Sequence, residues 1–203
     1  MTIHPIATLA LCTSLILPMP ALAVARVGEP APAFSATDTT GKTHALADYK
    51  GKYVVLEWVN PSCPFVVKHY SSGNMQSTQQ QATGAGAVWL AVNSTAQSHH
   101  EYLEPAALGN WMNKQKASPS ATLMDAAGSI GKAYGARTTP HMYIIDPQGT
   151  LIYAGAIDSK PSARIDDLAQ ASNYVKLGLS EAMAGKPLTT ASTRAYGCSV
   201  KYE

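Results

Sequence analysis

Short apolar runs of strand length recur along the chain, and polar segments with helix signals separate them. The runs are rich in β-branched residues and are bounded by Gly, Pro or Lys, which is typical of buried strands. The last two runs flank Pro147-Gln148-Gly149, a hairpin signal. We expect strands at 54–59, 87–92, 121–124, 142–146 and 150–155.

Helices are expected between and after these strands. One is predicted at 64–84, because a proline at its start loses no hydrogen bond in the first turn of a helix. Less regular patterns predict helices at 101–114 and 130–134. The last helix is predicted at 162–184, where apolar residues recur near one face and a glycine and a proline follow.

This order of elements indicates an α/β fold. Helices that alternate with strands predict a central mixed, mainly parallel sheet with helices on both faces, and the final hairpin is expected to add an antiparallel edge. We expect one domain at 24–187 and a polar tail at 188–203. The sequence shows no internal repeat and no second domain.

Composition and charge exclude several functional classes. Of the 203 residues, 46% are apolar and 14% are charged, which excludes a disordered chain. The 15 basic and 13 acidic residues leave a net charge of +2 without a concentrated basic patch, so we expect no nucleic-acid partner. The sequence also lacks the glycine-rich loops that bind phosphates or dinucleotides, and we expect no cofactor.

One cluster of metal-ligand residue types occurs, His99-His100-Glu101. Side chains of adjacent residues on a helix diverge by about 100°, which makes a poor shared site. We therefore expect a surface loop here and no bound metal.

Residues 1–23 have the pattern of a secretory signal peptide. The apolar run at 6–17 is too short to span a bilayer, and the small-x-small motif at 21–23 marks a cleavage site. We expect a periplasmic or secreted protein with no membrane contact after cleavage; an uncleaved anchor is the alternative. Cleavage leaves two of the three cysteines, Cys63 and Cys198, the number that a disulfide or a redox couple requires.

Cys63 lies between a predicted buried strand and the helix that starts at Pro64. At this position the unpaired N–H groups and the positive end of the helix dipole stabilise a thiolate, the reactive form of cysteine. Lys68 and His69 could add positive potential, or they could be ordinary exposed helix residues. Because open α/β sheets bind ligands at strand ends, we expect a nucleophile at Cys63 rather than a small core residue.

Three segments together resemble the peroxiredoxin-like redoxins of the alkyl hydroperoxide reductase/thiol-specific antioxidant (AhpC/TSA) family. They are the segment around Cys63, Thr138-Thr139-Pro140, and the tail at 196–202. In addition, 27–34 looks like the opening strand of that family, and 45–52 looks like the approach to its first central strand. The resemblance extends from residue 27 to the C-terminus and implies a thioredoxin-like fold.

The resemblance also implies roles for individual residues. Cys63 matches the nucleophilic cysteine, and Pro140 matches the cis-proline that lies beside it in thioredoxin-like folds. A cis bond there would hold the preceding carbonyl where an extended substrate backbone could pair with it. Glu57, six residues before Cys63, matches a buried acid whose raised pKa suits proton relay; an exposed strand carboxylate is the alternative.

The chain departs from the patterns of both related enzyme classes. Thioredoxins carry Cys-x-x-Cys, but Val66 stands at the second cysteine position here. Peroxiredoxins have a threonine three residues before the nucleophile to orient the peroxide, and Asn60 stands there. They also use a distant arginine to hold the thiolate, for which Arg137 is the candidate near the active-site loops.

Cys198 lies 135 residues after Cys63, in a tail with little reason to be buried. It could swing to Cys63 as a resolving cysteine. We therefore expect a thiol-dependent oxidoreductase with peroxiredoxin-like antioxidant activity, a peroxide or disulfide substrate and an external thiol reductant. The alternatives are a periplasmic thiol–disulfide oxidoreductase and a non-catalytic thioredoxin-fold binding module with a structural Cys63–Cys198 disulfide.

Overall fold

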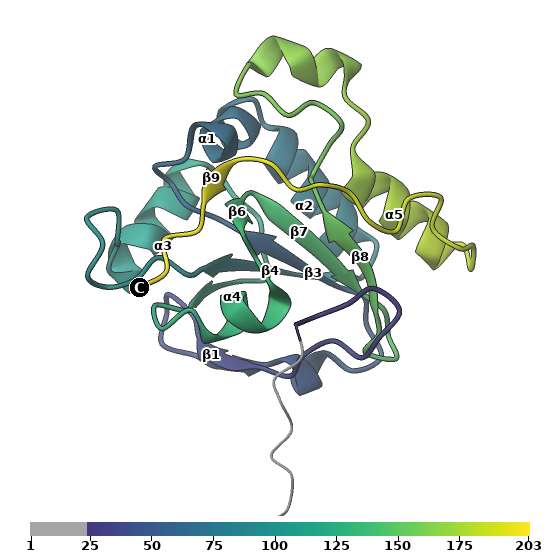
Figure 1. The fold of residues 1–203 in the computed structure, drawn as a ribbon, viewed down its shortest axis with the longest axis horizontal. Helices are drawn as coiled ribbons and strands as arrows, with labels where there is room; N and C mark the ends of the chain where they lie inside the picture. The colour runs from purple at the N-terminus through teal and green to yellow at the C-terminus, as the bar shows by residue number, and fades with distance from the viewer. Residues whose placement is uncertain (1–23) are drawn as a thin grey trace, which may run out of the picture.

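A five-stranded mixed sheet forms the centre of the protein, with strand order β5-β4-β3-β7-β8 (Figure 1). The computed structural model describes residues 24–203, so the predicted signal peptide lies outside the described residues. The strands of this sheet are β3 (Val54–Trp58), β4 (Val88–Asn93), β5 (Ala121–Met124), β7 (His141–Ile145) and β8 (Leu151–Gly155).

The α/β class is confirmed, but the sheet is less parallel than expected. The pairs β3–β4 and β4–β5 are parallel, and the pairs β3–β7 and β7–β8 are antiparallel. The hairpin β7–β8 is therefore not an added edge: β7 lies directly against β3 and supplies half of the pairings. The strand predicted at 121–124 matches the observed one, and the other four predicted strands differ from the observed ones by one residue at one or both ends.

Side chains of β3 alternate between two hydrophobic clusters, one on each face of the sheet. Val55 and Val59 contact the cluster under α1 (Pro64–Ser71), α2 (Asn74–Gly84), α3 (Pro105–Lys114) and α5 (Tyr174–Met183). Val54, Leu56 and Trp58 contact the opposite cluster. That face is covered by α4 (Ser129–Tyr134), the 3-10 helix η1 (Leu46–Tyr49), and segments next to β1 (Ser35–Thr37) and β2 (Thr43–Ala45). Among the described helices, none is long and apolar enough to cross a membrane.

The predicted helices differ from the observed ones where capping residues interrupt the apolar pattern. Gly73, with φ 76°, ends α1 and starts α2, so the helix predicted at 64–84 is two helices. The helix predicted at 162–184 is a 3-10 helix, η2 (Ile165–Gln170), followed by α5. The Asn173 side chain accepts a hydrogen bond from the Lys176 N–H and thereby caps α5.

Two further expectations about local structure were wrong. The segment 27–34 is not a strand; it is irregular backbone with one isolated bridge between Pro30 and Thr150, and β1 follows it. The helix predicted at 101–114 begins only at Pro105, because a proline is tolerated in the first helical turn but not inside a helix.

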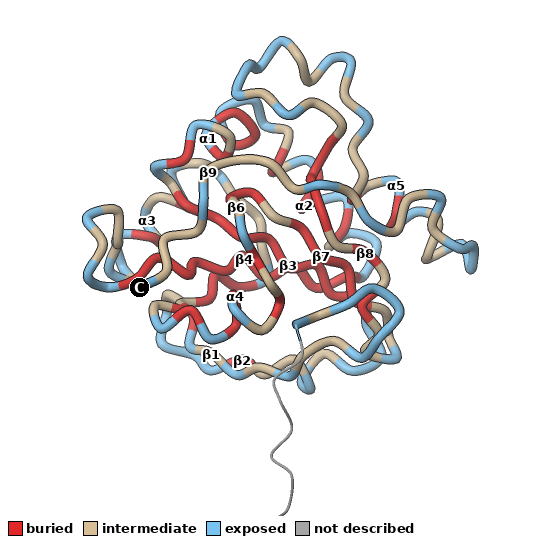
Figure 2. The backbone as a smooth tube through the Cα atoms, in the orientation of Figure 1, coloured by how far each residue is buried: buried red, intermediate tan, exposed pale blue. Residues whose placement is uncertain are grey.

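The C-terminal tail is docked along the domain instead of being free in solvent. Its strand β9 (Cys198–Ser199) pairs antiparallel with β6 (Thr138–Thr139). Before β9, the Thr193 N–H donates to Ala154 O, and after it the Lys201 carbonyl accepts from the Ala96 N–H. Most residues of the tail are half-buried (Figure 2). The tail is therefore part of the folded structure.

Gly155 is the point at which the tail crosses β8 most closely. A Cβ atom there would lie 2.6 Å from the Thr193 carbonyl oxygen, so we expect Gly155→Ala to lower the free energy of unfolding by about 1–3 kcal/mol through overpacking. Urea denaturation followed by circular dichroism measures this. Gly84→Ala, where a Cβ would meet open space, serves as the control and should cause little change. Equal effects of the two substitutions would contradict close packing of the tail.

Candidate active site

Cys63 is the N-cap of α1 and lies five residues after Trp58, the last residue of β3. Pro64 occupies the first helical turn, as predicted, and the Cys63 side chain is 1% exposed. The thiol donates a hydrogen bond to the Thr139 carbonyl oxygen at 3.0 Å. The peptide bond between Thr139 and Pro140 is cis, also as predicted. The strand end, the helix start and the proline loop therefore meet at this sulfur atom.

Cys198 is brought to the same place by the tail. It lies opposite Thr139 in the β6–β9 pair, and both cysteines are free thiols. Burial raises the pKa of Cys198 to about 12, and a hydrogen bond with Cys63 and the negative charge of that neighbour act in the same direction. Two cysteines that are 135 residues apart in the sequence thus lie close enough to interact.

Asn60 is buried and supports the loop before Cys63. Its side-chain oxygen accepts a hydrogen bond from the Ser62 N–H at 2.8 Å, and its amide nitrogen donates to Glu101 at 2.6 Å. Its backbone carbonyl accepts from the Cys63 N–H. The Asn60 side chain therefore shapes the turn that presents Cys63, and its polar atoms are directed at Ser62 and Glu101.

Glu57 is wholly buried on the same face of the sheet as Cys63, which excludes the exposed alternative. Burial raises the pKa of Glu57 to about 7, although hydrogen bonds from three neighbours oppose this shift. These donors are Tyr70 at 2.8 Å, Gln79 at 3.1 Å and Trp89 at 2.7 Å. Cys63 is not among its partners, so proton relay to the thiol by Glu57 stays a prediction.

Arg137 does not support the role expected from the peroxiredoxin pattern. Its side chain is exposed, and its guanidinium takes part in none of the hydrogen bonds or ion pairs found within residues 24–203. Its backbone carbonyl instead accepts from the Val200 N–H and so helps to hold the tail.

Lys68 and His69 are fully buried, contrary to the exposed alternative. Both face Asp158, with their nitrogens 3.8 Å from its Oδ2 atom. Burial lowers the pKa of His69 to about 4, so this side chain is neutral at neutral pH and adds no positive potential. Burial also lowers the pKa of Lys68, while the charge of Asp158 opposes that shift.

Tyr196 connects this buried group to the tail. Its hydroxyl donates to Asp158 Oδ1 at 2.5 Å and lies 3.3 Å from His69 Nε2 and 3.5 Å from Lys68 Nζ. Its ring packs edge-on against Phe65, two residues after Cys63. We call Lys68, His69, Asp158 and Tyr196 the tail anchor.

Thr139 and the tail anchor contain functional groups that sequence reasoning missed. The Thr139 hydroxyl and the Asp158 Oδ2 atom are both buried, and neither has a hydrogen-bond partner among residues 24–203. The one available sequence signal for the anchor was adjacent Lys68-His69 immediately after a cysteine, and nothing in the sequence connected it to Asp158 or Tyr196.

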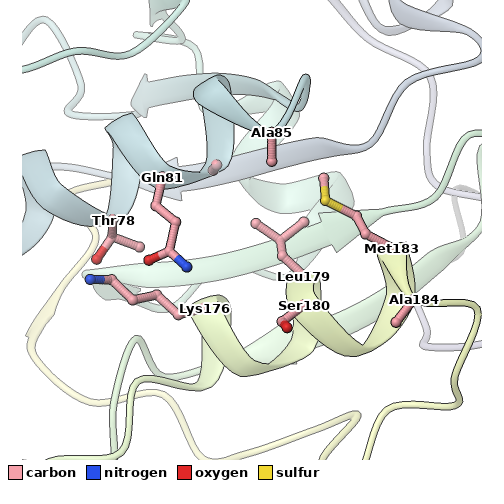
Figure 3. A pocket seen from close by; sticks show the side chains of 9 residues that line it. Thr78, Gln81, Ala85, Lys176, Leu179, Ser180, Met183 and Ala184 are labelled. Carbon is pink, nitrogen blue, oxygen red and sulfur yellow. The ribbon is translucent and has the colours of Figure 1, made fainter.

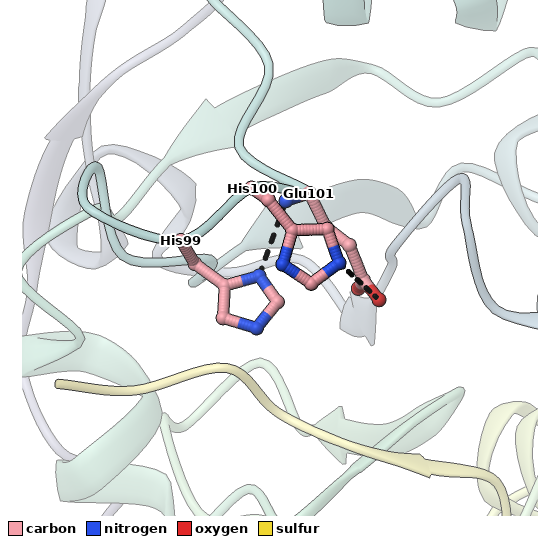
Figure 4. A group of neighbouring side chains, drawn as sticks. All are labelled: His99, His100 and Glu101. Atoms are coloured by element: carbon pink, nitrogen blue, oxygen red, sulfur yellow. Dashed lines mark hydrogen bonds and ion pairs between the residues drawn. The ribbon is translucent and has the colours of Figure 1, made fainter.

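The argument against a shared site at His99, His100 and Glu101 was wrong in its geometry. These residues lie in a loop before α3, and their ligand atoms are all within 4.8 Å of one another (Figure 4). His99 Nδ1 already accepts from the Glu101 N–H, and the Glu101 carboxylate accepts from Asn60. Each side chain retains one ligand atom for a cation, but the His100 side chain is 84% exposed. The expected absence of a metal stays a prediction.

A separate pocket lies between α2 and α5 (Figure 3). It has a volume of about 380 Å³, and its lining includes Leu179, Met183 and Lys176. Neither cysteine of the described chain lines it, so it is distinct from the thiol pair.

The model of the AhpC/TSA family matches residues 27–154. The chain belongs to the AhpC/TSA family. This match includes Cys63 and the cis-proline, while Cys198 and the rest of the tail lie beyond it. No curated protein sequence matches the chain significantly.

Similar solved structures confirm the thioredoxin-like fold. An uncharacterized conserved protein from Geobacillus kaustophilus is 24% identical, with a TM-score of 0.76, over 92% of this chain and 98% of that one. A hypothetical protein from Sinorhizobium meliloti 1021 is 22% identical, with a TM-score of 0.74, over 89% of this chain and 97% of the other. The thioredoxin domain of a thiol-disulfide oxidoreductase from Bacteroides vulgatus is 19% identical, with a TM-score of 0.52, over 71% and 96%.

The raised pKa of Glu57 predicts a specific pH dependence of stability. Because the folded protein holds this proton up to about pH 7 and the unfolded chain releases it near its ordinary pKa of 4.5, the contribution of Glu57 to stability is complete at low pH and is lost between these values. The loss is on the order of 3 kcal/mol.

His69 and His141, whose pKa values burial lowers to about 4, act in the opposite direction, so wild type alone does not isolate Glu57. We expect the unfolding free energy of wild type minus that of Glu57→Gln to fall between pH 4.5 and pH 7. Urea denaturation across this range measures the difference. A constant difference would mean that the pKa of Glu57 is not raised in the folded protein.

Proposed function

We propose that this protein is a thiol oxidoreductase in which Cys63 is the nucleophile and Cys198 is the resolving cysteine. The observation that carries the proposal is the juxtaposition of the two thiols at the N-terminus of α1, beside the cis-proline loop. Membership in the AhpC/TSA family supports redox chemistry at Cys63. The contact between buried Cys63 on the domain side and half-buried Cys198 on the tail side supports a dithiol–disulfide cycle.

The proposed reaction proceeds in two exchange steps. The Cys63 thiolate attacks one sulfur of a substrate disulfide, forms a mixed disulfide and releases the other substrate thiolate. The Cys198 thiolate then attacks the Cys63 sulfur, releases the remaining substrate thiolate and leaves a Cys63–Cys198 disulfide. Two electrons have passed to the substrate, and an external dithiol reductant restores the protein.

The electrostatics of Cys198 fit this order of steps. Burial is the largest cause of the raised pKa of Cys198; the hydrogen bond with Cys63 and the negative charge of its thiolate add to it, and Lys201 opposes it. Once Cys63 has formed a mixed disulfide, the two contributions of Cys63 disappear, which lowers the pKa of Cys198, while burial continues to raise it. Cys198 is therefore a better nucleophile after Cys63 has reacted than before.

Thiol–disulfide exchange is favoured over peroxide reduction by the surroundings of Cys63. The polar atoms of Asn60 are occupied by Ser62 and Glu101, and the Arg137 side chain is exposed. In peroxiredoxins the residue at the first position orients the peroxide, and the arginine holds the thiolate. Peroxide reduction stays the second candidate because of the family; there the products would be an alcohol, a Cys63 sulfenic acid and, on resolution, water.

The location and partners follow from the same chemistry. We propose an exported protein, because a cleavable signal at 1–23 leaves an even number of cysteines for an oxidising compartment. The reductant is then a thiol protein or small thiol of that compartment, and the substrate is a disulfide or a peroxide.

The cycle is tested by treating the reduced protein with a model disulfide or with peroxide and locating the modified cysteines by peptide mass spectrometry. We expect a Cys63–Cys198 disulfide in wild type, and a mixed disulfide at Cys63 in Cys198→Ser. Cys63→Ser should lose at least about a thousandfold in exchange rate, since the nucleophile is removed.

Tyr53→Phe, which removes a hydrogen bond to Ala182 O away from the thiols, is the control and should leave the exchange rate unchanged. If peroxide gives a sulfenic acid at Cys63 in Cys198→Ser faster than the disulfide reacts, the order of the two candidates is reversed. An oxidised pair that resists mild reductant in the folded state would contradict a redox cycle and indicate a structural disulfide.

A further inference from the structure

We infer that the C-terminal tail is a built-in pseudosubstrate: β9 occupies the strand edge at which an extended polypeptide would bind, so that the docked tail hinders polypeptides far more than small disulfides or peroxides. This inference rests on the proposed function and specifies its substrate class. Four features carry it: the β6–β9 pair, the conformation of Gly197, the contact between Cys63 and Cys198, and the tail anchor.

The strand β6 is the backbone edge closest to the nucleophile. The Thr139 carbonyl accepts the hydrogen bond from Cys63, and Thr139 is also the residue directly opposite Cys198. A polypeptide that presents a cysteine to Cys63 would gain its backbone hydrogen bonds by adding a strand here. The tail already forms that strand, and its own cysteine takes the place of the substrate cysteine.

Gly197 makes the close approach of the tail possible. Its φ is 133°, and a Cβ atom would overlap the Thr139 carbonyl. Any other residue at this position would therefore push β9 away from β6. The absence of a side chain lets the chain turn from Tyr196 into β9 directly over the proline loop.

The tail anchor opposes release of β9. The Tyr196 hydroxyl donates a short hydrogen bond to Asp158, and Lys68 and His69 beside them are also buried. A hydrogen bond to a buried charged group is stronger than one between neutral groups, and losing it leaves the charge unsatisfied. Tyr196 is two residues before Cys198, so releasing β9 from the edge of β6 strains or breaks the hydrogen bond between Tyr196 and Asp158.

The two classes of substrate consequently meet different barriers. Cys63 is 1% exposed while the tail is docked. A small disulfide needs only a local opening over one sulfur atom, whereas a polypeptide disulfide needs the whole edge of β6. In the released form, the Cys63 thiolate would attack the peptide disulfide, a peptide–Cys63 disulfide would form, and the leaving thiolate would depart. The tail therefore sets the substrate size rather than the chemistry.

Two disulfides with the same leaving group test this inference. One is dithiobis(nitrobenzoate), and the other is an extended peptide of about eight residues whose cysteine carries thionitrobenzoate. Both release the coloured thionitrobenzoate when Cys63 attacks. The rates are measured in the Cys198→Ser protein, which retains the docked tail but has no resolving thiol.

We expect Tyr196→Phe and Gly197→Ala, each added to Cys198→Ser, to raise the rate with the peptide by at least about tenfold and to change the rate with the small reagent much less. The two substitutions release β9 by different means, one by removing a bond and one by steric overlap. Tyr53→Phe also removes one tyrosine hydrogen bond, to Ala182 O, far from the tail, and should change neither rate. Circular dichroism verifies that each variant is folded.

Equal increases for both reagents would overturn the inference, since the tail would then be a general cover over Cys63. Unchanged rates for both reagents would also overturn it. If Cys63 reacts with neither reagent in any folded variant, but does react in urea, the proposed function fails together with the inference.

Discussion

The pairing of β6 with β9 is the interaction on which the rest of the site depends. It is only two residues long, yet it places Cys198 opposite Thr139, whose carbonyl accepts the hydrogen bond of Cys63. One backbone segment therefore contacts both thiols. Such a short ladder is not stable alone, and the contacts of Thr193, Tyr196 and Lys201 on either side of it supply the remaining free energy.

The helical face that carries Cys63 also buries most of the unusual charges of the protein. Glu57 lies under α1 and α2, and the tail anchor lies between α1 and the tail. Both groups are held in place by tyrosine hydroxyls, Tyr70 and Tyr196, in an otherwise apolar layer. Glu57 accepts three hydrogen bonds, and a buried polar group satisfied in this way fixes one arrangement of its neighbours more strongly than apolar contacts do. The orientation of α1, and thus of its N-cap, is specified in this way.

Local patterns predicted much of the fold and of the nucleophile. The cis bond before Pro140 is as the family resemblance implied. The strand at 121–124 matches its predicted ends, and the N-cap position of Cys63 is as expected. These features depend on residues that are close in the sequence. The docking of the tail, the burial of Lys68 and the convergence of His99 with Glu101 were not predicted, because they depend on contacts that form only when distant segments fold together.

The break in the helix predicted at 162–184 has a different cause. Its apolar spacing is compatible with a single helix, but the side chain of Asn173 competes for the backbone and starts a new one. Ile165, which the pattern placed on the buried face, is exposed as a result. Periodicity alone does not distinguish one long helix from two capped elements.

The distance in sequence between the two thiols has a consequence for the order of folding. A polypeptide is synthesised from its N-terminus, and domains form as their segments become available. All five strands of the central sheet precede residue 156, whereas Cys198 follows the last of them by 43 residues. Cys63 is therefore made, and its sheet can assemble, before Cys198 exists. A copy of the protein cut between β8 and Cys198 would leave Cys63 without the thiol and the tail that cover it in the folded domain.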